Sequence, residues 1–170
     1  VMTDIPPFRV VIGANGSGKS TLFDVFGFLR DCLKNDVSRA LQARGGFNQV
    51  VSRGAGKKDC IEFEIKFRMP IANKERLVTY SIQIGLNGNK PVIRREILKY
   101  KRGRYGSPYR FLDFSNGEGY AITNEEDFDK PDEDLDREYQ QVESHSLAIK
   151  GLGQFARFKA ASAFRQLIEN

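Results

Sequence analysis

The sequence lacks long apolar runs and has only two cysteines and one histidine among its 170 residues. No stretch approaches the roughly 18 to 20 consecutive apolar residues that would cross a bilayer, so we expect no membrane segment. Residues 1–7 hold no basic region followed by an apolar run, which is the pattern of a secretion signal. Cys32 and Cys60 do not stand at metal-ligand spacing, so we expect two free thiols in a reduced, cytoplasmic compartment.

The net charge of +5 conceals an uneven distribution along the chain. Residues 1–110 carry 21 Lys and Arg against 9 Asp and Glu, whereas residues 111–170 carry 6 against 13. Nine of the acidic residues fall between positions 125 and 138, around Pro131, where we predict a flexible surface loop. A split of this size is compatible with a polyanion-binding face in the first part of the chain.

Hydrophobic periodicity predicts a mixed α/β chain. A β-branched run at 8–12 indicates a buried strand, and an amphipathic helix follows from Lys19 to about residue 34. Asn35 or Asp36 can cap a second short helix that Gly45 and Gly46 end. Alternating patterns predict a run of antiparallel strands joined by short turns, and a last helix is expected at 155–168. The expected strands are 60–69, closed by Pro70, then 77–86, 92–101, 109–114 and 120–123.

Residues 13–21 read GANGSGKST, which satisfies the phosphate-binding pattern G-x-x-x-x-G-K-[ST]. Glycines let the backbone N–H groups approach phosphate closely, and the helix that begins after them directs its positive dipole end at the same place. The lysine neutralises the β- and γ-phosphates, and the serine hydroxyl provides a magnesium ligand. The predicted nucleotide-binding residues are Gly13, Asn15, Gly16, Ser17, Gly18, Lys19, Ser20 and Thr21, with Ser20 as the Mg²⁺ ligand.

ATP is the expected nucleotide. Guanine-specific proteins of this class usually read the base through Asn-Lys-x-Asp. The nearest string here, at 73–76, is Asn-Lys-Glu-Arg and ends in the wrong residue.

The P-loop with Asn15, its place near the amino end and the β-rich region after the first helix resemble ATPases of the SMC, RecF and OLD type. The resemblance implies an α/β P-loop NTPase fold in which residues 1–170 form the first lobe of an ABC/SMC-type head. Within that lobe we expect a strand-helix unit at 8–34, an antiparallel β subdomain at 60–123, the acidic loop at 125–138 and the last helix. The resemblance also implies that the protein binds ATP with Mg²⁺ and acts in DNA repair or anti-phage defence.

The same resemblance suggests two further site residues. Arg44, in the string RGGFNQVV, is similar to an arginine that lies near the nucleotide and DNA side of SMC heads. An exposed arginine in a loop that ends a helix is the alternative. In the family a glutamine near the second lobe contacts magnesium and the attacking water. Gln154 is the nearest candidate by position, followed by Gln140 and Gln141.

Two elements of an ABC-type ATPase are missing from the sequence, namely the LSGGQ-like signature and the apolar strand that ends in Asp-Glu (Walker B). The string at 111–113 is interrupted by Arg110 and followed by Phe114, and the string at 115–119 is expected to be a hairpin turn. The chain is therefore predicted to be active only when a second lobe and a partner head, as in a homodimer, complete it, with an effector protein as a further partner.

Seven basic residues and three tyrosines lie between positions 94 and 110. They could bind the phosphates and bases of DNA or RNA, or they could form a solvated face. The candidates for nucleic-acid contact are Arg94, Arg95, Lys99, Lys101, Arg102 and Arg104.

Three other functions are compatible with the P-loop. They are the nucleotide-binding subunit of an ABC transporter, a small-molecule or polynucleotide kinase, and a nucleotide-dependent scaffold that no longer hydrolyses.

Overall fold

The computed structural model describes residues 19–51, 60–71, 74–100, 108–123 and 134–169. Six strands form one sheet, in which each strand pairs antiparallel with the next one along the chain. The predicted antiparallel pairing is thereby confirmed. The strands are β1 (Cys60–Ile71), β2 (Lys74–Asn87), β3 (Lys90–Tyr100), β4 (Tyr109–Ser115), β5 (Glu118–Ile122) and β6 (Arg137–Gln141).

Tight two-residue turns connect two of these pairs, with Gly88 and Asn89 in one turn and Asn116 and Gly117 in the other. Gly88 has a φ of 59° between β2 and β3, and Asn116 and Gly117 have φ values of 50° and 88° between β4 and β5. Asn and Gly tolerate positive φ, and this backbone twist matches that of paired strands. The string at 115–119 is thus the hairpin turn that the sequence predicts.

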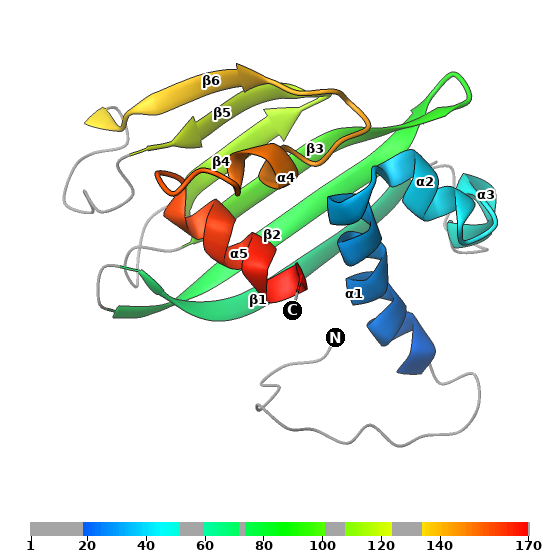
Figure 1. Cartoon of the computed structure of the whole chain (residues 1–170), viewed down its shortest axis with the longest axis horizontal. Coiled ribbons are helices and arrows are strands. Elements are labelled where there is room, and N and C mark those ends of the chain that lie inside the picture. The colour runs from blue at the N-terminus through cyan, green and yellow to red at the C-terminus, as the bar shows by residue number, and fades with distance from the viewer. Residues whose placement is uncertain (1–18, 52–59, 72–73, 101–107, 124–133, 170) are drawn as a thin grey trace.

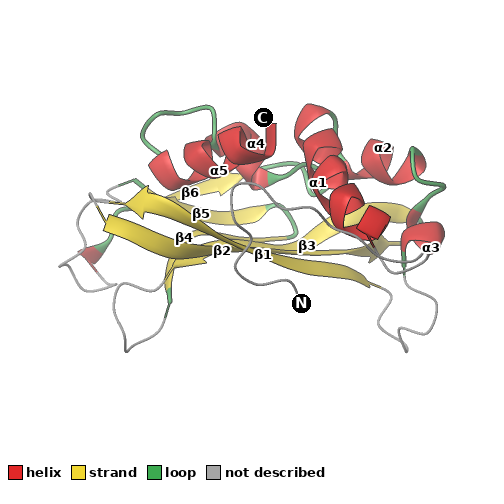
Figure 2. Ribbon diagram, turned by 90° about the horizontal axis from the view of Figure 1, so that it is seen from below, coloured by secondary structure: helices red, strands yellow, loops and turns green. Residues whose placement is uncertain are grey.

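All the helices pack on one face of the sheet (Figure 2), which we call the inner face. They are α1 (Lys19–Lys34), α2 (Val37–Gln42), α3 (Phe47–Val50), α4 (Ala148–Leu152) and α5 (Lys159–Glu169). The first and last helices of the chain lie near each other over β1 and β2 (Figure 1). The opposite, outer face carries no helix among the described residues.

The core lies between the helices and the inner face. Phe164 of α5 is 1% exposed and stacks on Phe67 of β1 and Tyr80 of β2, with ring centroids 4.9 and 4.3 Å apart. Phe28 of α1 meets Phe63 of β1 edge-on at 6.2 Å. These aromatic contacts fix both helices on the same two strands.

Helix boundaries agree with the sequence at the start of the chain and differ near its end. Asp36 caps α2 by accepting the Arg39 N–H at 2.8 Å, as expected. The last helix begins at Lys159 rather than at residue 155, because the preceding residues form a turn that leaves Phe155 53% exposed. The apolar segment at 147–149 contributes to the short helix α4, which the sequence does not predict.

Strand boundaries also differ from expectation, since β2 begins at Lys74 and β3 at Lys90 rather than at residues 77 and 92. Pro70 does not close β1, which continues to Ile71. β1 is an edge strand, where proline is tolerated. The predicted acidic loop ends early because Arg137 and Glu138 begin β6, so the β-rich region extends to residue 141. The P-loop strand at 8–12 and most of the acidic segment lie outside the described residues.

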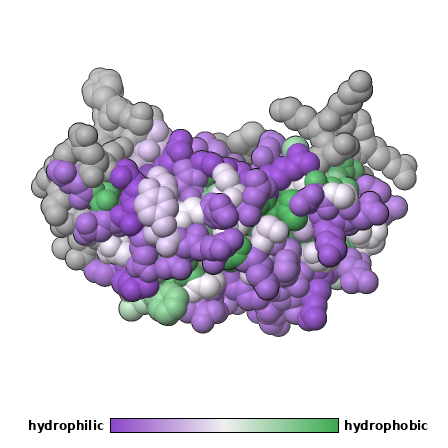
Figure 3. Space-filling view, turned by 90° about the horizontal axis from the view of Figure 1, so that it is seen from above, coloured by the Kyte–Doolittle hydropathy of each residue, from purple (hydrophilic) through white to green (hydrophobic). Residues whose placement is uncertain are grey.

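The surface that carries β6 is mainly hydrophilic, with small separate apolar patches (Figure 3). Within the described ranges, no helix has the length and apolar character needed to cross a membrane. Both cysteines are thiols rather than disulfide partners, with Cys32 in the core and Cys60 half-buried at the start of β1, as the sequence predicts.

Candidate nucleotide-binding site

The P-loop motif leads directly into α1. Lys19 and Ser20 are the first two residues of this 16-residue helix, and residues 13–18 lie outside the described part. The first turn of α1 contains no acidic residue, whereas Lys34 places a positive charge in the last turn. No carboxylate of the first turn therefore offsets the positive end of the helix dipole. An anion such as phosphate is stabilised at a helix end of this kind.

Apolar side chains hold α1 against the inner face. Phe28, Leu29, Cys32 and Leu33 recur at the spacing of one helix face, and each is at most 5% exposed. The buried stripe fixes the direction of the helix axis, and so the point at which its first turn ends. Figure 1 shows that this end of α1 lies away from α2 and from the β5–β6 side of the sheet.

Arg44 folds back onto α1. Its Nε donates to Asp24 Oδ1 at 3.0 Å, and its Nη1 donates to Asp31 Oδ2 at 2.7 Å and to the Ala40 carbonyl at 3.0 Å. The guanidinium carbon also lies 5.4 Å from the centroid of the Phe28 ring. Burial opposes the charge of Arg44, but the hydrogen bonds to the two aspartates outweigh it and raise the pKa of the guanidinium.

This arrangement places Arg44 beside the P-loop helix. Asp24 follows Ser20 by four residues, which is about 6 Å along a helix axis. A Cβ at Gly27 would lie 3.4 Å from Arg44 Nη2, so the guanidinium rests close to the surface of α1 at this point. Arg44 thus connects the segment that follows α2 to α1 through its side-chain hydrogen bonds. Its contact with nucleotide stays a prediction.

The candidate glutamines lie in two different places. Gln154 is exposed in the turn between α4 and α5, where its Nε2 donates to the Lys150 carbonyl at 3.2 Å. Gln140 and Gln141 lie on β6 and are also exposed, with side chains that donate to Glu138 and Glu118. The structure therefore separates Gln154, beside the helices, from the other two, at the edge of the sheet.

The basic candidates that the structure describes lie on β3. Arg94 crosses over Gly85 of β2 and donates from Nη2 to the Leu86 carbonyl at 3.3 Å. Arg95 forms an ion pair with Asp113 and a hydrogen bond with Ser115. Lys99 pairs in register with Arg110 and is half-buried. Lys101, Arg102 and Arg104 lie outside the described residues.

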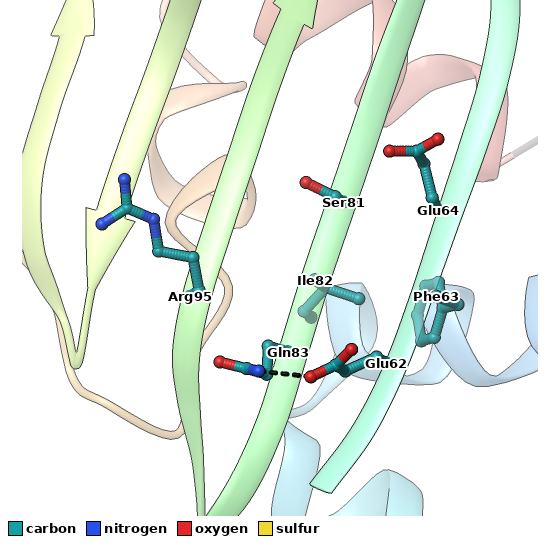
Figure 4. A pocket seen from close by; sticks show the side chains of 7 residues that line it. All are labelled: Glu62, Phe63, Glu64, Ser81, Ile82, Gln83 and Arg95. Carbon is teal, nitrogen blue, oxygen red and sulfur yellow. Dashed lines mark hydrogen bonds between the residues drawn. The ribbon is translucent and has the colours of Figure 1, made fainter.

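Arg95 borders a shallow depression of about 350 Å³ on the outer face, shown in Figure 4. The depression spans β1 to β3, and Gln83 donates to Glu62 across it. Because Glu62 and Glu64 line it together with Arg95, the depression is of mixed charge rather than basic. The remaining lining residues are Phe63, Ser81 and Ile82.

Asp113, from the string considered for Walker B, is held by two arginines. Its carboxylate contacts Arg95, and its Oδ2 lies 2.6 Å from Arg110 Nη1. The Asp113 side chain is only 7% exposed, whereas Arg95 and Arg110 are 38% and 51% exposed. Both carboxylate oxygens are therefore engaged in ion pairs on the outer face.

Sequence analysis missed one buried carboxylate, Glu96 of β3. It is 1% exposed and faces the helices. Burial raises its pKa to about 7, against the effect of hydrogen bonds from the Ala148 and Ile149 amides and the Tyr80 hydroxyl. One signal for its burial is that Glu96, Leu98 and Tyr100 stand at every second position of β3 and therefore share one face of the strand.

A family model described as "AAA domain, putative AbiEii toxin, Type IV TA system" matches residues 8–138, which is well over half of the chain. The chain belongs to this family. The match includes the P-loop motif, α1, Arg44 and β1 to β5. An AAA domain is a P-loop ATPase-type nucleotide-binding domain, and such domains generally use ATP with Mg²⁺. No curated protein and no solved structure matches the chain.

Proposed function

We propose that this AAA domain is the ATP-binding lobe of an SMC/RecF/OLD-like ATPase. It binds ATP with Mg²⁺ through residues 13–20 and hydrolyses ATP only when a Walker B strand and a partner's signature loop complete the site. The observation that carries the proposal is the position of Lys19, Ser20 and Thr21 in the first turn of a helix whose buried stripe packs on the sheet.

The chemistry of this end of α1 supports ATP–Mg²⁺ as the ligand. Lys19 supplies the cation and Ser20 the hydroxyl that the triphosphate and its magnesium require. Unpaired N–H groups of the first turn add donors, and no carboxylate competes for them in that turn. Thr21 follows Ser20 and completes the GKST end of the P-loop motif.

The described residues support a division between binding and hydrolysis. Asp113, the only aspartate that ends a short apolar string in the β region, is engaged by Arg95 and Arg110. The catalytic carboxylates of the proposed ATPase are therefore sought in a second lobe.

The proposed partner is a second copy of the same head, with closure of the two heads around ATP acting as a switch. DNA repair and anti-phage defence are the proposed settings, with nucleic acid or an effector protein as the object of the switch. The name of the family adds a toxin of a type IV toxin–antitoxin system as one form that such an effector could take.

The binding claim is tested by titrating the chain with ATP in the presence of Mg²⁺ by calorimetry. Lys19→Ala is expected to weaken ATP binding at least about tenfold, since it removes a charge-assisted contact with the phosphates. Lys34→Ala removes the same charge from the other end of α1 and is expected to leave the affinity unchanged. Equal affinities of the wild type and the Lys19→Ala variant would refute the proposed site.

A further inference from the structure

The carboxylate of Glu96 stands at a junction of three elements that lie far apart in the sequence. Its Oε2 accepts the Ala148 N–H at 2.7 Å, and its Oε1 accepts the Ile149 N–H at 3.1 Å. The Tyr80 hydroxyl donates to Oε1 at 3.1 Å. Glu96 therefore joins β3 and β2 to the first two residues of α4 through three hydrogen bonds.

The two amide N–H groups that donate to Glu96 have no hydrogen-bond acceptor within α4. A helix leaves its first N–H groups unpaired, and in α4 the N-cap residue Leu147 provides no side-chain acceptor. Ala148 and Ile149 are both fully buried, so water cannot replace the missing acceptor. Glu96 of β3 therefore provides the hydrogen-bond acceptor that the residues next to α4 do not provide.

Neighbouring backbone contacts bind the same segment to the end of α1 and to β3. The Val37 N–H donates to the His145 carbonyl at 3.0 Å, and the Ile93 N–H donates to the Ser144 carbonyl at 2.7 Å. Lys150 Nζ donates to the carbonyl of Asn35, the residue that follows α1. The segment at 144–150 is thus attached on both sides of Glu96.

The attachment continues through a tight turn to Gln154. The Gly153 N–H donates to the Ile149 carbonyl at 2.9 Å, and the Gln154 N–H donates to the Gly151 carbonyl at 3.2 Å. A Cβ at Gly153 would approach the Ile149 carbonyl oxygen to 2.6 Å, so the turn admits no side chain there. From Ala148 onward, the path to Gln154 is a continuous hydrogen-bonded turn.

We propose that Glu96 is a positioning residue, which fixes the turn at 147–154, and with it Gln154, against the sheet and the C-terminal end of α1. This end of α1 is opposite the end that follows the P-loop, so the proposal does not depend on the proposed function. The described groups that donate to Glu96 belong to β2 and α4, so it acts on Gln154 through the turn.

The surroundings of Glu96 make this attachment sensitive to pH. Within the described part of the chain, Tyr80 of β2, Cys32 of α1 and the two α4 amides face it, and no lysine or arginine forms an ion pair with it. Burial also raises the pKa of the Cys32 thiol, which therefore stays neutral. Closure of the turn keeps Glu96 protonated up to about pH 7, whereas an opened, hydrated carboxyl ionises near its ordinary value of 4.5. Raising the pH across this interval therefore favours opening.

The test is hydrogen exchange of individual amides in the nucleotide-free chain. Glu96→Leu removes both acceptor oxygens, and the protection of Ala148 and Ile149 is expected to fall at least about tenfold at pH 7. Asp113→Leu is the matched control, since it removes a buried carboxylate on the opposite face and should leave both amides protected. Unchanged protection in Glu96→Leu, or an equal loss in the control, would overturn the proposal.

The wild-type pH profile gives a second readout that does not depend on a variant. After correction for intrinsic exchange rates, the protection of Ala148 and Ile149 is expected to fall by up to tenfold per pH unit between about 5 and 7. A profile without pH dependence would contradict the proposal, even if Glu96→Leu fails to fold.

ATP titration separates this proposal from the proposed function. If the wild type binds no ATP, the proposed function fails, and the exchange measurements still decide whether Glu96 holds the turn.

Discussion

The two faces of the sheet each bury one carboxylate, and they stabilise it by opposite means. On the inner face, Glu96 lies among apolar side chains and is held by two amides and a hydroxyl, without an ion-pair partner among the described residues. On the outer face, Asp113 lies between Arg95 and Arg110, which remain partly exposed to water. Hydrogen bonds in a dry core and ion pairs at a wet surface should therefore respond differently to mutation, pH and salt.

The largest effect is expected from the packing of the inner face itself. Phe164→Ala removes a ring that is 1% exposed and stacked on two other aromatic rings. It should lower the free energy of unfolding by about 3–5 kcal/mol, measured by urea denaturation. Leu167→Ala, on the 52% exposed side of the same helix, should change it by less than about 1 kcal/mol. Similar losses in the two variants would mean that α5 does not cover the core.

The second effect distinguishes the two carboxylates by pH. Because the pKa of Glu96 is raised from 4.5 to about 7 in the folded chain, the folded state retains a proton that the unfolded state releases. Stability is therefore expected to fall as the pH rises from about 4.5 to 7, by at most about 3 kcal/mol, and then to level off. The difference between wild-type and Glu96→Gln urea curves across this range isolates the contribution. A difference that is constant with pH would contradict the raised pKa of the buried carboxyl.

A smaller effect is expected at the outer face. Asp113→Asn replaces two charge-assisted contacts and leaves Arg95 and Arg110 facing each other. Because both arginines are partly exposed, we expect a loss of about 1–2 kcal/mol that shrinks when the ionic strength is raised. Urea denaturation at low and high salt measures it. If salt leaves the loss unchanged, the carboxylate is held by packing rather than by charge.

The smallest effect is expected at the edge of the same face. Tyr139 of β6 is 72% exposed, although its ring centroid lies 5.7 Å from that of Tyr120. Tyr139→Ala should cost less than about 1 kcal/mol, since little apolar surface is lost. A loss as large as that of Phe164→Ala would indicate that the edge strand is essential to the fold.

The sequence predicts the elements whose patterns arise from burial on one side. α1 shows a helical stripe, and β1 alternates the inward residues Phe63 and Phe67 with outward charges. The start at Lys19 follows from the P-loop, and the turn at Asn116 from the positive φ that such turns need. In each case one local requirement points to one local structure.

The remaining features depend on contacts between distant parts of the chain. All residues of β6 are at least partly exposed, so no apolar alternation reveals this strand, which forms because β5 provides its partners. In the sequence, Glu96 is one charged residue within a basic segment. Only the register of β3 shows that its side chain points inward. The bulge between Gln83 and Ile84, opposite Arg94, shifts the alternation of β3 and conceals this orientation.

The site follows the same division. The P-loop can be predicted from the sequence because phosphate binding requires each of its residue types locally. The environments of Arg44 and Gln154 cannot be predicted in this way, because tertiary contacts determine them. Arg44 is drawn to Asp24 and Asp31 on α1, and Gln154 follows a helix that Glu96 attaches to the sheet.

The central claim is that residues 13–20 bind ATP while hydrolysis needs elements from another lobe and a partner head. Phosphate release by the isolated 170-residue chain, at ATP and Mg²⁺ concentrations shown by calorimetry to saturate it, tests this most directly. The account predicts saturable binding that depends on Lys19, with turnover far below the roughly 1 s⁻¹ at the low end of typical enzymes. Turnover at or above that rate, abolished by Lys19→Ala, would show that the chain already contains a complete active site and would contradict the account.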